Sequence, residues 1–120
     1  MARAQELIST AYRRFSGEVP ALGNLKLTIR LELRGRGDVQ VFGVRTPGPI
    51  ITKGEPENAR LELSIPRADF NELAERGKLN DWREAYEHGH LKVTGDREIQ
   101  QLLGKVIDRQ TARSRLKRAH

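Results

Sequence analysis

Hydrophobic and polar residues alternate without interruption along one segment of the chain, from Leu25 to Leu33. Leucine or isoleucine occupies every second position of this segment, and the positions between them are Lys26, Thr28, Arg30 and Glu32. A period of two residues is typical of an antiparallel strand with one face on the core and the other in solvent. The segment therefore predicts a half-buried strand.

Four more segments have the pattern of strands. Arg34 to Asp38 contains two glycines and predicts a tight reversal, after which a returning strand covers Val39 to Val44. Ile50 to Thr52 follows a turn with two prolines, which places this short strand at or near an edge of the sheet. Two further strands are predicted at Leu61–Ile65 and Leu91–Val93.

Apolar residues recur at helical spacing in the remaining segments. Residues 3–15 form one amphipathic pattern, with its stripe at Ala4, Leu7, Ile8, Ala11, Tyr12 and Phe15. Two short helices are expected between Pro66 and Gly89, the first around Phe70 and Leu73 and the second carrying Trp82 and Tyr86. A last helix follows Asp96, with its stripe at Ile99, Leu102, Leu103, Val106 and Ile107.

Residues with known preferences for helix ends stand at the expected boundaries. Pro66 suits the first turn of a helix, and Gly77 is expected to end that helix in the left-handed conformation. Asp81 with Glu84 matches a variant of the capping box, with Asn80 as the rival cap. Gly89 is expected to stop the second short helix, and Asp96 to cap the last one.

The resulting order is helix, four strands, two short helices, strand and helix. This order predicts an α+β fold with a five-stranded, mainly antiparallel sheet and helices packed on one face. The length of 120 residues suits one domain, which we place at residues 1–108. Residues 109–120 form a basic C-terminal tail, where Arg109, Arg113 and Lys117 continue at helical spacing on a segment that is either helix or disordered.

The positive charge is concentrated at the C-terminal end. Of the net charge of +6, residues 105–120 contribute six Lys/Arg against one Asp, so the rest of the chain is nearly neutral. A nucleic-acid-binding domain would be expected to carry its basic face on the folded body, so nucleic acid is not a favoured partner. The tail is either a solvated terminus or a site of contact with phosphates or an anionic membrane surface, through Arg109, Arg113, Arg115, Lys117 and Arg118.

The sequence lacks the residues or motifs that several classes of enzyme and binding site require. There are no cysteines, no serine lies in a nucleophile-elbow pattern, and no phosphate-binding loop occurs. His88-Gly89-His90 is a histidine pair that would need Glu87 or Asp96 as a further metal ligand, and its spacing matches no recognised metal motif. No segment is apolar enough to cross a bilayer. We expect a cytoplasmic protein that is not an enzyme and has no cofactor and no metal.

The segment Leu61–Asp96 resembles the sterol carrier protein family (type two), also called the nonspecific lipid-transfer or sterol-binding domain. The matching elements are the strand Leu61–Ile65, Asp69-Phe70 with Leu73, Gly77-Lys78-Leu79, Ala85-Tyr86, and the block from Gly89 to Asp96, with its G-x-L-K-V-x-G-D pattern. The resemblance implies a hydrophobic cavity between sheet and helices that carries a fatty acyl chain, a sterol-like molecule or another lipid. It also implies a bacterial-type stand-alone member, because the peroxisomal signal of eukaryotic members is missing.

The resemblance and the apolar faces together suggest the residues that would contact a lipid. These are Leu27, Ile29, Leu31, Phe42, Val44, Leu63, Phe70, Leu73, Trp82, Tyr86, Leu102, Leu103 and Val106. The chain has only one Met and three Phe, so it is poor in the adaptable residues that line pliable pockets. The alternative is an accessory protein-interaction module of the same fold with a collapsed cavity and an unidentified protein partner. Periodicity alone does not distinguish a filled core from a tunnel.

Overall fold

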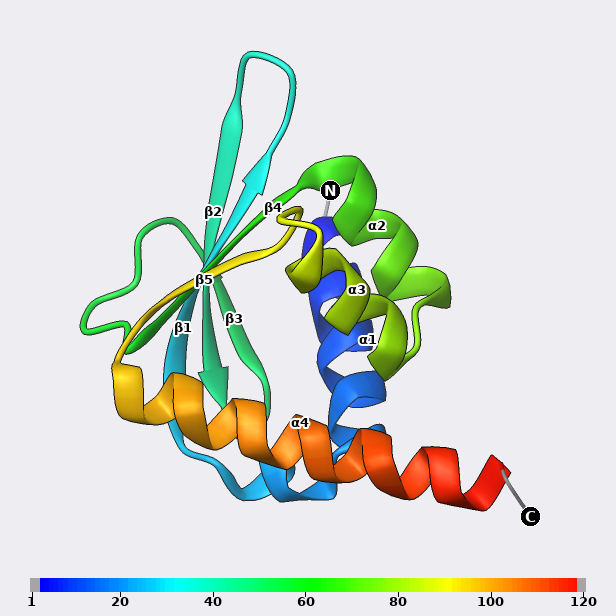
Figure 1. Cartoon of the computed structure of the whole chain (residues 1–120). Coiled ribbons are helices and arrows are strands. Elements are labelled where there is room, and N and C mark those ends of the chain that lie inside the picture. Colours follow the sequence, from blue (N-terminus) through cyan, green and yellow to red (C-terminus); the bar gives the residue numbers. More distant parts are fainter. Residues whose placement is uncertain (1–2, 119–120) are drawn as a thin grey trace.

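The computed structural model describes the backbone of residues 3–118 and the side chains of residues 3–113 (Figure 1). Its elements follow the predicted order, with one additional short 3₁₀ helix, η1. They are α1 (Arg3–Glu18), η1 (Pro20–Asn24), β1 (Leu27–Arg34), β2 (Val39–Thr46), β3 (Ile50–Lys53), β4 (Leu61–Pro66), α2 (Arg67–Arg76), α3 (Leu79–Glu87), β5 (Lys92–Gly95) and α4 (Arg97–Arg118).

The five strands form one sheet in the order β3-β2-β1-β4-β5. All neighbouring pairs are antiparallel except β1 and β4, which run parallel with Leu31 beside Leu63. The four α-helices lie on the same side of the sheet, and α4 runs across one end of it (Figure 1). The predicted fold class is therefore confirmed, and the short strand β3 is an edge strand as expected.

The apolar face of the central strand β1 is the surface that the helices cover. Leu27, Leu31 and Leu33 are all buried on this face, whereas Arg30 and Glu32 lie on the other. One core cluster joins Leu31 and Leu33 to residues of β2, β4, α1 and α2, and a smaller one joins Leu27 to Leu61 and Ile99. Each fully buried large apolar side chain stabilises the fold by about 1.5–3 kcal/mol.

Residues at three helix ends differ from the predictions in conformation or position, although α2 ends before Gly77 as expected. Gly77 is extended (φ −73°, ψ 140°) rather than left-handed, and a Cβ at this position would lie 2.6 Å from the carbonyl oxygen of Leu73. Asp81 is the third residue of α3 instead of its cap, and its carboxylate accepts a hydrogen bond from the backbone N–H of Lys78. Pro66 is the last residue of β4 and the residue before α2, not part of the helix.

The start of β1 and the extent of α4 also differ from the predictions, whereas the predicted roles of Gly89 and Asp96 are confirmed. β1 starts at Leu27 instead of Leu25, because Leu25 is the residue that caps the C-terminal end of η1 and its backbone N–H bonds to Leu22. The backbone of α4 is helical through Arg118, across the expected boundary at residue 108. Gly89 does adopt positive φ after α3, and the Asp96 carboxylate accepts the backbone N–H groups of Glu98 and Ile99 at the start of α4.

The uncovered face of the sheet carries a network of charged side chains. Arg30 donates to both carboxylate oxygens of Glu55 at 2.8 Å, and the hydroxyl of Ser64 donates to Glu32 at 2.7 Å. The Ser64 hydrogen bond, with help from Arg30, lowers the pKa of Glu32 below its ordinary value. A carboxyl whose pKa is lower in the folded state stabilises the fold above its unfolded pKa, and this contribution is lost as the pH falls through the folded value.

Replacing Ser64 with Ala should therefore destabilise the protein in a pH-dependent way. We expect the free energy of unfolding to fall by about 1 kcal/mol at neutral pH, because a hydrogen bond to a charged group is lost. The loss should shrink at acidic pH, once the pH falls through the lowered pKa of Glu32 and its carboxylate is protonated in both proteins. Urea unfolding at the two pH values measures the difference. Thr94→Ala is the matched control, since the Thr94 hydroxyl lies 3.4 Å from the exposed Glu62. An equal loss in both variants, or a loss independent of pH, would contradict the role of Ser64.

Gly95 should tolerate no side chain. Its φ is 120°, and a Cβ would lie 2.5 Å from the carbonyl oxygen of Arg60 and 3.0 Å from the Cα of Leu61. We expect Gly95→Ala to reduce the free energy of unfolding by about 2–3 kcal/mol. Gly17→Ala in α1, where a Cβ meets nothing within 4 Å, should leave stability unchanged or raise it slightly. Thermal melts of the two variants test the contrast, and equal melting temperatures would refute it.

Candidate functional site

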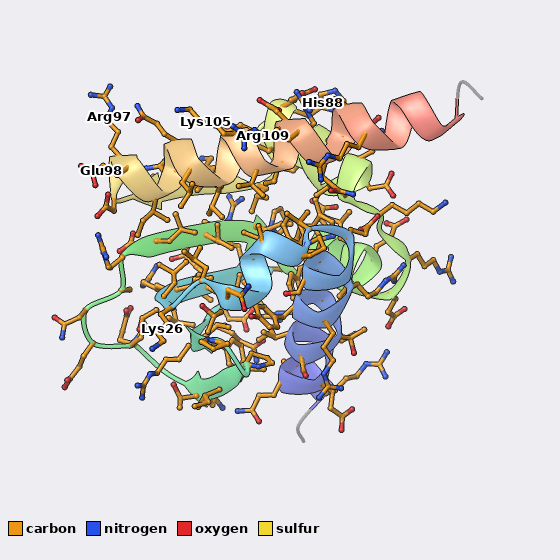
Figure 2. The ribbon with its side chains drawn as sticks, turned by 90° about the horizontal axis from the view of Figure 1, so that it is seen from below. Lys26, His88, Arg97, Glu98, Lys105 and Arg109 are labelled. Atoms are coloured by element: carbon orange, nitrogen blue, oxygen red, sulfur yellow. The ribbon has the colours of Figure 1, made fainter. Side chains whose placement is uncertain are left out.

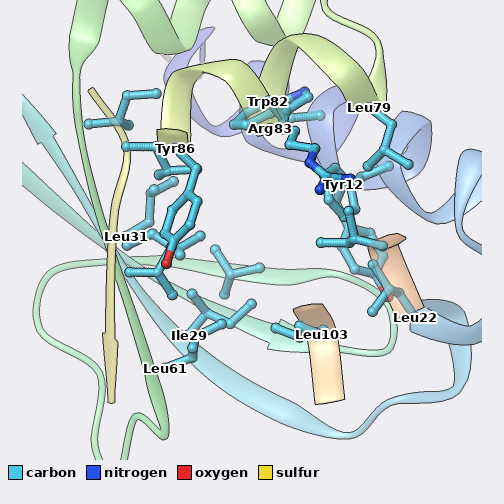
Figure 3. Close-up of a pocket in the computed structure, with 18 of the residues that line it drawn as sticks. Tyr12, Leu22, Ile29, Leu31, Leu61, Leu79, Trp82, Arg83, Tyr86 and Leu103 are labelled. Atoms are coloured by element: carbon cyan, nitrogen blue, oxygen red, sulfur yellow. The ribbon is translucent and has the colours of Figure 1, made fainter. Parts of the chain in front are cut away.

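A cavity of about 510 Å³ lies between the sheet and the helices (Figure 3). Its walls come from β1, β2, β4 and β5 on one side and from the four α-helices and η1 on the other. The volume falls within the range of about 300–1,000 Å³ that is typical of small-molecule sites.

The cavity lies between the two core clusters. Ile29 and Leu63 are only partly buried, and each packs against both clusters. They lie on neighbouring strands of the parallel β1–β4 pair, two residues apart in register, since Ile29 pairs with Leu61 and Leu63 with Leu31. The leucines of the cavity floor, among them Leu31 and Leu61, lie beside Ile29 (Figure 3). The sheet wall is therefore entirely apolar near its centre.

Aromatic side chains from three helices form the opposite wall. Trp82 of α3 makes edge-to-face contacts with Phe15 of α1 and Phe70 of α2, with ring centroids 6.1 and 6.0 Å apart. Such pairs stabilise by about 0.5–1.5 kcal/mol beyond their buried area. They fix the position of α3 over the sheet. From the same helix, Tyr86 projects toward the leucines of the sheet wall (Figure 3).

Helix α4 has one face on the cavity and one face in solvent. Leu103, Gly104 and Ile107 line the cavity at helical spacing. The labelled side chains of Arg97, Lys105 and Arg109 lie on the side of α4 away from the sheet (Figure 2). This helix therefore separates the cavity from a basic outer surface.

A small group of polar side chains also borders the cavity. Arg83 of α3 donates from Nε to Glu87 at 3.1 Å and forms an ion pair with Asp108 of α4 at 3.0 Å. The Arg83 side chain extends from α3 toward Tyr12 of α1 (Figure 3). Ser16, one turn beyond Tyr12, also lines the cavity. Arg83, Glu87 and Asp108 thus form one charged group where α3 and α4 approach each other.

Most of the residues suggested by sequence for lipid contact do line this cavity. Those that line it are Leu27, Ile29, Leu31, Val44, Leu63, Phe70, Trp82, Tyr86 and Leu103. Four others do not: Phe42 is buried in the main core cluster, Leu73 packs beside that cluster, Leu102 is 47% exposed, and Val106 is half-buried. That the lining residues contact a lipid stays a prediction.

The proposed anionic-surface residues fall partly outside the described side chains. Arg109 and Arg113 are exposed on α4. The side chains of Arg115, Lys117 and Arg118 lie outside the described residues, although the helix backbone is described to Arg118.

Some lining residues were not found by sequence analysis. Tyr12 and Phe15 belong to the stripe of α1, which predicted packing but gave no sign of a cavity beneath it. Leu22 lies in η1, a turn that no periodic pattern indicated. Ser16 and Arg83 are polar and were set aside by a search for apolar faces. Because Ser16 follows Tyr12 by four residues, its place on the buried face could have been recognised.

Within residues 3–113, no group of three or more His, Asp or Glu side chains is arranged to hold a metal ion. The His88 and His90 rings lie 6.5 Å apart, and His90 is near Asp69 at 3.7 Å. Across the described helices, none combines the length and the apolar character that crossing a bilayer requires.

Comparison with solved structures identifies the fold. The palmitated SCP2L2 of Aedes aegypti superposes with a TM-score of 0.59 at 15% identity, over 83% of this chain and 93% of that chain. The crystal structure of sterol carrier protein 2 like 2 from the same organism gives 0.56 at 16% identity, over 86% and 98%. Apo sterol carrier protein 2 of Yarrowia lipolytica gives 0.51 at 17% identity, over 72% and 83%.

By sequence, no family model and no curated protein matches the chain. The structural matches extend over most of both molecules, and they show that the chain has the fold of sterol carrier protein 2. The fold predicted from the resemblance is therefore confirmed.

Proposed function

We propose that this protein binds and carries a hydrophobic ligand, a lipid, in the cavity between its sheet and its helices, without catalysing a reaction. The observation that carries the proposal is the cavity of about 510 Å³ with its largely apolar wall. The palmitated state of the Aedes aegypti protein of the same fold supports it further. Our expectation of a cytoplasmic location is part of the same proposal.

The chemistry of the wall suits a lipid better than a polar metabolite. An apolar ligand gains about 25 cal/mol for each Å² that it removes from water. The few polar groups at one end would orient the ligand but provide little selection along its length. The alternative function, an interaction module with a collapsed cavity, is not favoured because the space is present.

Gly104 offers a way to fill the cavity without disturbing the core. It lines the cavity on α4, and a Cβ at this position meets nothing within 4 Å. Because leucine is a strong helix former, Gly104→Leu should fold at least as well as the unmodified protein. We expect its affinity for a fluorescent fatty-acid analogue to fall at least about tenfold, and native mass spectrometry should detect less co-purified lipid.

Gln101→Leu is the matched control, since Gln101 is exposed on the same helix and does not line the cavity. This variant should bind the analogue as the unmodified protein does. If the unmodified protein retains no lipid and binds no fluorescent analogue at micromolar concentration, the proposed function is wrong. Equal binding by the two leucine variants would place the ligand outside this cavity.

The C-terminal tail is proposed to make transient contact with anionic membranes. A basic residue near an anionic surface contributes about 1 kcal/mol, and the effect is screened by salt. Replacing Arg109, Arg113, Arg115, Lys117 and Arg118 with glutamine should weaken binding to phosphatidylserine-containing vesicles at least about tenfold. Sedimentation with vesicles at low and high salt measures this change.

A control variant should neutralise two exposed cations far from the tail, Arg36 and Lys53. This variant should bind the vesicles nearly as well as the unmodified protein. Salt-sensitive binding that survives the glutamine substitutions in the tail would exclude the proposed contact and leave the cavity proposal intact.

A further inference from the structure

The wall of the cavity contains one group of exposed residues. Of the described residues that line the cavity, only four are exposed, and they are Tyr86 and Glu87 on α3 and Gly104 and Asp108 on α4. The other described lining residues are buried or half-buried. Glu87 and Asp108 both contact the guanidinium of Arg83, so the two exposed segments lie beside each other. The cavity therefore opens to solvent between α3 and α4.

The two helices at this opening pack on different parts of the core. Trp82 of α3 packs against the main core cluster, whereas Ile99 and Leu103 of α4 belong to the smaller cluster with Leu27. Among the described residues, neither cluster includes side chains from both α3 and α4. Each helix is thus held to the sheet independently of the other. The gap between them can widen while both clusters stay intact.

One charged contact crosses the opening. Arg83 projects from α3 on the side of the cavity (Figure 3), and its Nη1 lies 3.0 Å from Oδ1 of Asp108 on α4. Among the side chains of residues 3–113, no other hydrogen bond or ion pair connects these two helices. The second contact of Arg83, to Glu87, stays within α3. The Arg83–Asp108 pair is therefore the polar contact that breaks when α3 and α4 separate.

We propose that a ligand enters and leaves the cavity between α3 and α4, and that the Arg83–Asp108 pair is the latch that closes this entrance. The inference rests on the proposed lipid-binding function and adds the route that the ligand takes. A contact that only closes an entrance slows entry and exit by the same factor. The latch therefore sets the two rates and leaves the affinity nearly unchanged.

Cross-linking α3 to α4 tests the entrance, because the chain has no cysteine and an introduced pair reacts alone. The double variant Arg83→Cys, Asp108→Cys is loaded with a fluorescent fatty-acid analogue and then joined by a short bismaleimide. Release of the analogue to excess phosphatidylcholine vesicles is followed by fluorescence. We expect release to be at least about tenfold slower than from the same variant capped with N-ethylmaleimide, since the helices can no longer separate.

The double variant Arg3→Cys, Glu75→Cys is the matched control. These two residues form an ion pair between α1 and α2 at 2.9 Å, and neither lines the cavity. Linking them should leave the release rate unchanged. Unchanged release after linking positions 83 and 108, or equal slowing in both double variants, would overturn the inference. If the unmodified protein binds no analogue at all, the proposed function itself is wrong.

The Asp108→Asn variant tests the latch. Association and release of the analogue should each become about two- to fivefold faster, with the dissociation constant changed less than about twofold. Stopped-flow fluorescence measures both rates. Asp38→Asn is the control, because Asp38 forms a similarly exposed ion pair with Arg67 at 2.8 Å and does not line the cavity. Unchanged rates in Asp108→Asn would refute the latch, and so would a change in affinity without a parallel change in both rates.

Discussion

The apolar face of β1 is the surface on which the rest of the structure depends. This strand is the centre of the sheet, and its buried leucines must be kept from water on one side only. Helices α1 and α2 cover the end near Leu33, whereas α4 covers the end near Leu27 through Ile99. Because these two groups of helices pack on opposite ends of one continuous apolar surface, the region around Ile29 between them is only partly covered. The cavity is the result of that division.

Much of this arrangement could be predicted because it depends on local patterns. The alternation in β1 identifies the buried face, and the stripe of α4 identifies the side that packs on it. The Asp96 cap and the Gly89 stop were also readable, since each acts within a few residues of its own position. The end of α2 before Gly77 was also predicted, but its cause was not, because the need for glycine comes from the close approach of Leu73 instead of from a positive φ.

The cavity itself could not be read from the sequence in the same way. Periodicity states which side of a helix is apolar, but not how far that side lies from the sheet. The same stripe on α1 therefore contains Ile8, which is buried in the core, and Phe15, which borders a space. Arg83 and Asp108 meet beside that space only because α3 and α4 pack against each other. Such a grouping depends on tertiary distances that no short window of sequence contains.

The contact between α3 and α4 has a kinetic consequence. The start of α4 is fixed by the Asp96 cap and by Ile99 in the core, whereas farther along it is tied to α3 by the Arg83–Asp108 pair, whose side chains are 33% and 65% exposed. An ion pair so open to water contributes about 0–1 kcal/mol. Separating α3 from α4 therefore costs less free energy than disrupting the sheet. The separation of α3 from α4 should therefore depend on ionic strength, whereas the overall stability of the protein should stay nearly constant.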